Sequence, residues 1–167
     1  MKTRALLALL ASLAFAEALS AQTKTNGTLQ CSKADPMNAV EVGDHPGHLF
    51  YVAKQACTWT KPMEMAGAST KDGGSVAAGE IRGGKSSDSG AHWSSMSNGD
   101  KIFVSYHGTT TMDKDGHPQS SRGHWAYTGG TGKLKGVSGK GTYAGKANSD
   151  GSMTYEIEGD YKVPAAK

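Results

Sequence analysis

The sequence predicts an all-β protein, most simply an antiparallel eight-stranded up-and-down barrel. Short segments rich in aromatic and β-branched residues recur along the chain, and turn residues separate them at short intervals. No segment after the first 21 residues has the periodicity of an amphipathic helix. Closing such a meander into a barrel removes the strand edges that an open sheet leaves exposed. A two-sheet β-sandwich fits the same pattern and is the alternative.

Residues 1–21 have the layout of a secretory signal peptide: Lys2 and Arg4 precede an apolar run, and small residues follow it. The run is too short to span a membrane. We therefore expect an exported protein, periplasmic or secreted, without a membrane span. Residues 22–47 are polar and interrupted by proline and glycine, so they are expected to hold one short strand, at 28–31. A barrel domain is expected over residues 48–167.

The first half of that domain begins with the aromatic and β-branched segment 48–60, which predicts a strand ending at Lys61-Pro62. Residues 64–69 and 75–82 are predicted strands on either side of a hairpin turn at 71–74, Lys-Asp-Gly-Gly. Residues 83–90, GGKSSDSG, have the composition of a flexible loop. A short strand at 92–96 and a turn at 98–100 complete this half.

The second half contains the clearest strand, residues 101–111, KIFVSYHGTTT. A turn at 113–118 and a strand at 123–128 follow. Strands at 141–146 and 152–162 are joined by a turn at 148–151, Asn-Ser-Asp-Gly. In the last strand Tyr155 and Ile157 alternate with Glu156 and Glu158, which predicts one apolar and one acidic face.

Aliphatic residues are scarce after residue 21, with three Leu, three Ile and seven Val, so aromatic side chains must fill part of a thin core. Cys31 and Cys57 are the only cysteines. In an exported protein such a pair favours a disulfide, which would support a small core. A redox or metal pair would have the closer CxxC spacing, which is absent here.

Other function classes find little support in the composition. The net charge is only +3, and the charged residues are interspersed along the chain, so we expect no nucleic-acid partner. The glycine-rich segment 129–141 lacks the order of a Walker loop and the strand–turn–helix context of a dinucleotide site, so it predicts structural turns. The six histidines are scattered. We therefore expect neither a metal site nor a cofactor.

Two sets of residues are candidates for function. Glu80 is the candidate catalytic carboxylate, because the small residues 77–79 beside it would leave room for a ligand. A cavity lined by aromatic side chains would suit a lipid, terpenoid or phenolic ligand. The candidate ligand-binding residues are Trp59, Phe103, Tyr106, His107, Trp125 and Tyr127. Periodicity leaves open whether the face with Phe103 and His107 lines a lumen or lies at the surface.

Four motifs in order from Cys57 onwards resemble bacterial exported proteins related to the allene oxide cyclase barrel, itself similar to the plant dirigent barrel. They are CTWTKPMEMAG, NGDKIFVSYHGT, GHWAYTGGTGKLKGVSGKGTYAGK and DGSMTYEIEGDY. The resemblance implies an eight-stranded antiparallel barrel with a partly apolar cavity, assembled as a homodimer or homotrimer. Plant cyclases and dirigent proteins control the shape of a reacting molecule in that cavity. No motif that carries a catalytic group is matched.

The sequence thus favours an exported, non-catalytic barrel that binds a small apolar ligand in its cavity. A barrel filled with side chains, with a structural or interaction role, is the first alternative. The second is an allene oxide cyclase-like isomerase or cyclase that acts by shape control.

Overall fold

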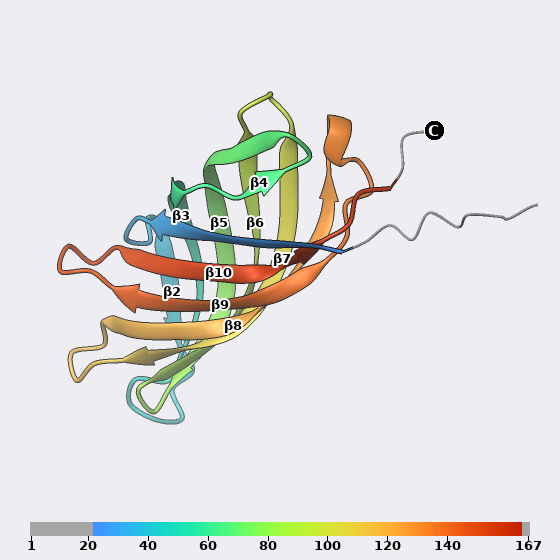
Figure 1. Ribbon diagram of the computed structural model, residues 1–167. Coiled ribbons are helices and arrows are strands. Elements are labelled where there is room, and N and C mark those ends of the chain that lie inside the picture. The colour runs from blue at the N-terminus through green and yellow to red at the C-terminus, as the bar shows by residue number, and fades with distance from the viewer. Residues whose placement is uncertain (1–21, 165–167) are drawn as a thin grey trace, which may run out of the picture.

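The computed structural model describes residues 22–164, which form an all-β fold of ten strands and one 3-10 turn, η1 (Gly132–Leu134) (Figure 1). Eight strands close an antiparallel barrel in the order β1–β3–β5–β6–β7–β8–β9–β10, with β10 returning to β1. The predicted eight-stranded barrel is confirmed, and the sandwich is not formed. The strands are β1 (Thr23–Cys31), β2 (Met37–Glu41), β3 (Leu49–Lys61), β4 (Glu64–Met65), β5 (Ala68–Arg82), β6 (Lys85–Met96), β7 (Lys101–Met112), β8 (Pro118–Gly130), β9 (Lys140–Ala147) and β10 (Met153–Tyr161).

The segment before residue 48 contributes more than the one short strand expected at 28–31. β1 runs from Thr23 and closes the barrel by pairing with β10 over its whole length. β1 and β2 share one edge of β3. β1 pairs with the C-terminal part of β3, Cys57–Lys61, and β2 pairs with its N-terminal part, Leu49–Ala53. The expected signal peptide lies outside the described residues.

The predicted disulfide is present between Cys31 and Cys57, which are direct cross-strand partners on β1 and β3. Both cysteines are almost fully buried. The bond lies where the edge of β3 passes from β1 to β2. It therefore ties β1 to β3 at the point where β2 takes over the edge of β3.

Two turn predictions were wrong. β5 continues through residues 71–74, because Gly73 approaches β6 so closely that a Cβ there would collide with the carbonyl oxygen of Trp93. The reversal before β5 lies instead at Ala66–Gly67, where both residues have positive φ. Residues 83–90 are not a flexible loop either: Gly83 and Gly84 alone make a tight turn with positive φ, and β6 starts at Lys85.

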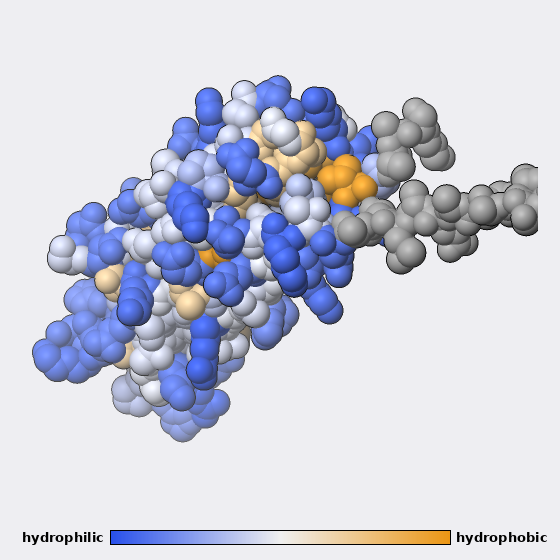
Figure 2. Space-filling model, viewed as in Figure 1, coloured by the Kyte–Doolittle hydropathy of each residue, from blue (hydrophilic) through white to orange (hydrophobic). Residues whose placement is uncertain are grey.

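Alternation along the strands separates an apolar interior from a polar exterior. In β10 the prediction is confirmed: Tyr155 and Ile157 pack against the core, while Glu156 and Glu158 are exposed. Figure 2 shows a mainly hydrophilic outer face over β1, β8, β9 and β10, with scattered apolar residues. Among the described residues, no helix is long and apolar enough to cross a membrane.

Candidate ligand-binding site

The barrel interior holds a cavity of about 190 Å³ that is lined mainly by apolar and aromatic side chains. One end is closed, because Met63, Met65 and Leu134 are 3%, 1% and 1% exposed and fill it. At the other end Met37 and Pro118 line the cavity and are also exposed to solvent. The cavity therefore opens to solvent between β2 and the β7–β8 loop.

Inward-facing glycines explain why the interior is not filled. Tyr143 lies over Gly108 and Gly123, where any Cβ would collide with its hydroxyl group. Trp125 lies in the same way over Gly141 and Gly159. Because these rings occupy the space that side chains at the glycines would fill, they lie against the wall of the barrel and leave an open cavity.

A carboxylate faces this cavity from the middle of β6. Asp88 lies between Gly79 on β5 and Gly108 on β7, so its cross-strand neighbours have no side chains. The Tyr51 hydroxyl donates a hydrogen bond to Asp88 Oδ2 at 3.2 Å and lies 2.8 Å from Ser86 Oγ. Since the single Tyr51 hydrogen goes to the carboxylate, Ser86 donates to Tyr51.

Burial raises the pKa of Asp88, and the hydrogen bond from the Tyr51 hydroxyl group offsets this only in part. An ionised carboxylate accepts up to about four hydrogen bonds. Asp88 therefore has acceptor capacity left for a donor that enters the cavity.

Tyrosine rings form much of the wall around Asp88. Tyr143 contacts Tyr106 and Tyr155 edge to face, with ring centroids 6.2 and 5.9 Å apart. The Tyr106 hydroxyl lies 2.7 Å from Ser75 Oγ. Burial raises the pKa of each of these tyrosines, so all three hydroxyl groups stay protonated at neutral pH.

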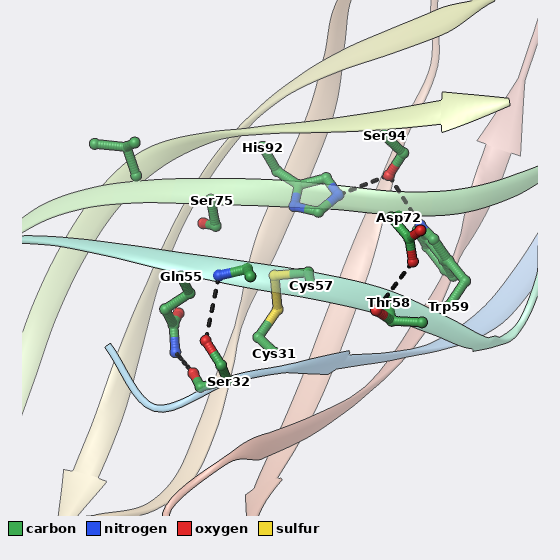
Figure 3. The surroundings of a disulfide bond; sticks show 12 residues. Cys31, Ser32, Gln55, Cys57, Thr58, Trp59, Asp72, Ser75, His92 and Ser94 are labelled. Atoms are coloured by element: carbon green, nitrogen blue, oxygen red, sulfur yellow. Dashed lines mark hydrogen bonds between the residues drawn. A yellow bond between two sulfur atoms is a disulfide. The ribbon is translucent and has the colours of Figure 1, made fainter. Parts of the chain in front are cut away.

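A second polar group lies nearer the closed end, beside the disulfide (Figure 3). Trp59 Nε1–H donates to Ser94 Oγ at 2.8 Å, and His92 Nε2 lies 2.8 Å from the same oxygen. Burial lowers the pKa of His92 to about 4, so its ring is neutral at neutral pH.

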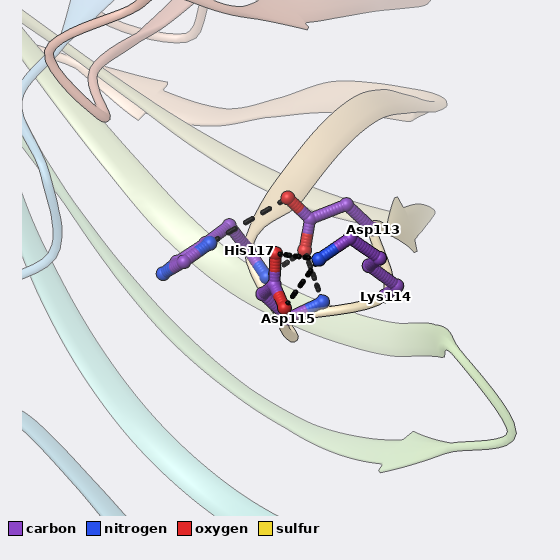
Figure 4. A network of polar contacts seen from close by, with 4 residues as sticks. All are labelled: Asp113, Lys114, Asp115 and His117. Carbon is purple, nitrogen blue, oxygen red and sulfur yellow. Dashed lines mark hydrogen bonds and ion pairs between the residues drawn. The ribbon is translucent and has the colours of Figure 1, made fainter.

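The β7–β8 loop at the open end is held by its own polar contacts (Figure 4). The Asp113 carboxylate accepts hydrogen bonds from the backbone N–H groups of Asp115 and His117, at 2.9 and 2.8 Å. The bond from His117 is the main cause of a lowered Asp113 pKa. These contacts fix the positions of Met112 and Pro118, which line the cavity at either end of the loop.

Four of the six candidate ligand-binding residues line the cavity: Trp59, Tyr106, Trp125 and Tyr127. Phe103 and His107 do not, because side chains on β7 alternate and Ile102, Val104 and Tyr106 take the inner face. Phe103 is 39% exposed on the outside. His107 stacks there on His124, with ring centroids 5.5 Å apart.

Glu80 also lies outside the cavity, on the outer face of β5. Its Oε1 is 2.8 Å from His48 Nε2, and Asp44 contacts the other nitrogen of the same ring. The site carboxylate is Asp88, which the sequence analysis did not single out. A hairpin turn at Gly83-Gly84 would have made residues 85–92 a strand. Alternation along that strand places Ser86, Asp88, Gly90 and His92 on one face, and this pattern could have identified Asp88 from the sequence.

Fold and cavity define a closed antiparallel β-barrel with an internal, partly polar pocket. Within residues 22–164 no group of three or more His, Cys, Asp or Glu side chains is arranged to hold a metal ion.

No protein-family model matches the chain, and no curated protein sequence matches it. Solved structures that are similar to it include the following two. The pterocarpan synthase dirigent protein GePTS1 is 15% identical over 98% of this chain and 100% of that chain, with a TM-score of 0.47. Pyocyanin demethylase is 16% identical over 80% of this chain and 98% of that chain, with a TM-score of 0.40.

Proposed function

We propose that the barrel binds a compact phenolic compound, with its ring among the lumen aromatics and its hydroxyl group directed at Asp88. The observation that carries this proposal is a half-buried carboxylate with a raised pKa in an apolar cavity that opens to solvent. A cavity with a few convergent polar groups and a perturbed pKa is the usual form of a small-molecule site.

The size of the cavity favours a small ring system. Apolar protein cavities of roughly 150 Å³ hold benzene. At about 190 Å³, this lumen suits one substituted ring better than the chain of a lipid.

The chemistry of Asp88 selects a phenol over an apolar terpenoid. A buried carboxylate is destabilised unless donors surround it, and hydrogen bonds to charged groups contribute roughly 1.5–3 kcal/mol. A phenolic O–H supplies one such donor, while the face of its ring packs on Tyr106 and Tyr143. A terpene hydrocarbon would displace water from the carboxylate and would offer no hydrogen bond in its place.

A filled structural barrel is less well supported, because several inward positions carry small side chains around an open cavity. Ala53, Ser75 and Ala77 are examples. The buried disulfide is of the kind that forms in oxidising compartments, which supports our proposal that the protein acts outside the cytosol.

Isothermal titration calorimetry tests the proposal with 4-isopropylphenol and its methyl ether, 4-isopropylanisole, which cannot donate a hydrogen bond. We expect wild-type protein to bind the phenol at least about tenfold more tightly. Asp88→Asn should reduce this preference by at least about threefold, because a neutral acceptor forms the weaker bond. Asp72→Asn, on the exposed outer face of β5, is the matched control and should keep it. Absence of binding by either compound, or an unchanged preference in Asp88→Asn, would refute the proposal.

A further inference from the structure

His92 occupies a second polar position in the same lumen, and nothing in the proposed binding mode uses it. It lies four residues beyond Asp88 on β6, so both side chains share the inner face. At about 3.3 Å per residue, the two Cα atoms are about 13 Å apart along the strand. Asp88 is nearer the open end, while His92 is nearer the closed end, next to Ser94 and Ile102.

The contacts of Ser94 determine which nitrogen of His92 carries the proton. Trp59 Nε1–H can only donate, so Ser94 Oγ accepts that bond. Ser94 is 0% exposed. If His92 Nε2 also donated to Ser94, the serine hydrogen would be buried without an acceptor, which costs about 1–3 kcal/mol. Ser94 therefore donates to Nε2, and the proton of the neutral ring is on Nδ1.

The Nδ1–H group has no hydrogen-bond partner among the described residues. In Figure 3 this second ring nitrogen points away from Ser94. His92 lines the cavity, and its Nδ1 is not among the fully buried unpartnered atoms, so it is accessible from the lumen. The lumen thus presents an acceptor, Asp88, and a fixed donor, His92, on one wall.

We infer that the ligand carries a hydrogen-bond acceptor opposite its hydroxyl group, and that this acceptor binds His92 Nδ1–H. The matching class is the para-acyl phenols, in which one ring separates a hydroxyl donor from a carbonyl acceptor. Gly90, between the two polar residues, is covered by the hydroxyl end of Tyr106, so the ring of the ligand would pack against that tyrosine. This inference rests on the proposed function and narrows the ligand from phenols in general to para-acyl phenols.

Calorimetry with 4-hydroxyacetophenone and 4-isopropylphenol tests the inference, because a carbonyl oxygen in the first replaces a methyl group in the second. Wild-type protein should bind 4-hydroxyacetophenone about three- to tenfold more tightly, the range of one hydrogen bond. His92→Phe should remove that preference and still bind 4-isopropylphenol. His124→Phe, on the outer face, is the matched control and should keep the preference.

The outcomes separate the two proposals. Binding of both compounds with no preference, or a preference that survives in His92→Phe, overturns the role of His92 and leaves the proposed function intact. Failure of both compounds to bind wild-type protein overturns both proposals.

Nitrogen-15 NMR of wild-type protein gives an independent test that does not require the variant to fold. The His92 ring should show a protonated Nδ1 and an unprotonated Nε2, and the Nδ1 signal should shift on addition of 4-hydroxyacetophenone. A protonated Nε2, or an Nδ1 signal that does not respond, overturns the inference.

Discussion

Reducing the Cys31–Cys57 disulfide should lower the free energy of unfolding by about 3.5 kcal/mol. The two cysteines are 26 residues apart, and the loop-entropy relation for a loop of that length gives about 12 cal/mol/K, or about 3.5 kcal/mol at 25 °C. β1 and β3 already place the cysteines opposite one another. The effect should therefore come mainly from the larger freedom of the unfolded chain.

Urea unfolding of oxidised and reduced wild-type protein, followed by tryptophan fluorescence, measures this difference without changing a side chain. The double variant Cys31→Ala/Cys57→Ala is the control and should unfold identically with and without reductant. A difference below about 1 kcal/mol between the oxidised and reduced forms would refute the entropic reasoning.

Two further predictions concern the lumen. Gly108→Ala should destabilise the protein by about 1–3 kcal/mol, because the new methyl group meets the Tyr143 hydroxyl group. Gly129→Ala is the control and should change the midpoint of urea unfolding little, because the nearest atom to its methyl group, outside the neighbouring residues, would be 3.9 Å away. Equal effects of the two substitutions would contradict the packing argument. His92 should destabilise the folded protein in acid. In the unfolded state its ring binds a proton below about pH 6.5, whereas in the folded state burial lowers the pKa to about 4. The free energy of unfolding should therefore decrease as the pH is lowered from 6.5 to 4. Between pH 7 and 4.5 this loss should be about 2 kcal/mol larger in wild-type protein than in His92→Leu, and identical pH profiles would show that His92 is not desolvated.

The fold was predictable from sequence because most strands alternate and most turns carry glycine with asparagine or aspartate. The turn prediction around Gly99 and the prediction of a disulfide between Cys31 and Cys57 were confirmed. The prediction of a turn at 71–74 was wrong because Gly73 and Gly74 lie where β5 closely approaches Trp93 on β6. Glycine is required there for lack of space, and the same residue type is typical of turns.

The site was less predictable because it depends on which face of each strand turns inward. On β7 the aromatic residues fall on both faces, and only the register places Tyr106 inside and Phe103 outside. Asp88 lies in a segment of serine and glycine that resembles a loop in composition. Its role depends on neighbouring glycines on β5 and β7, which are brought beside it only by strand pairing.

The most direct test of a ligand in the lumen compares Ala77→Leu with Ala78→Leu. These adjacent alanines on β5 face opposite ways: Ala77 lines the cavity, and Ala78 is exposed on the outside. By calorimetry with 4-isopropylphenol, Ala77→Leu should lose at least about tenfold in affinity, because three added carbons occupy the cavity, while Ala78→Leu should stay within about twofold of wild type. Equal affinities in the two variants would contradict binding inside the barrel.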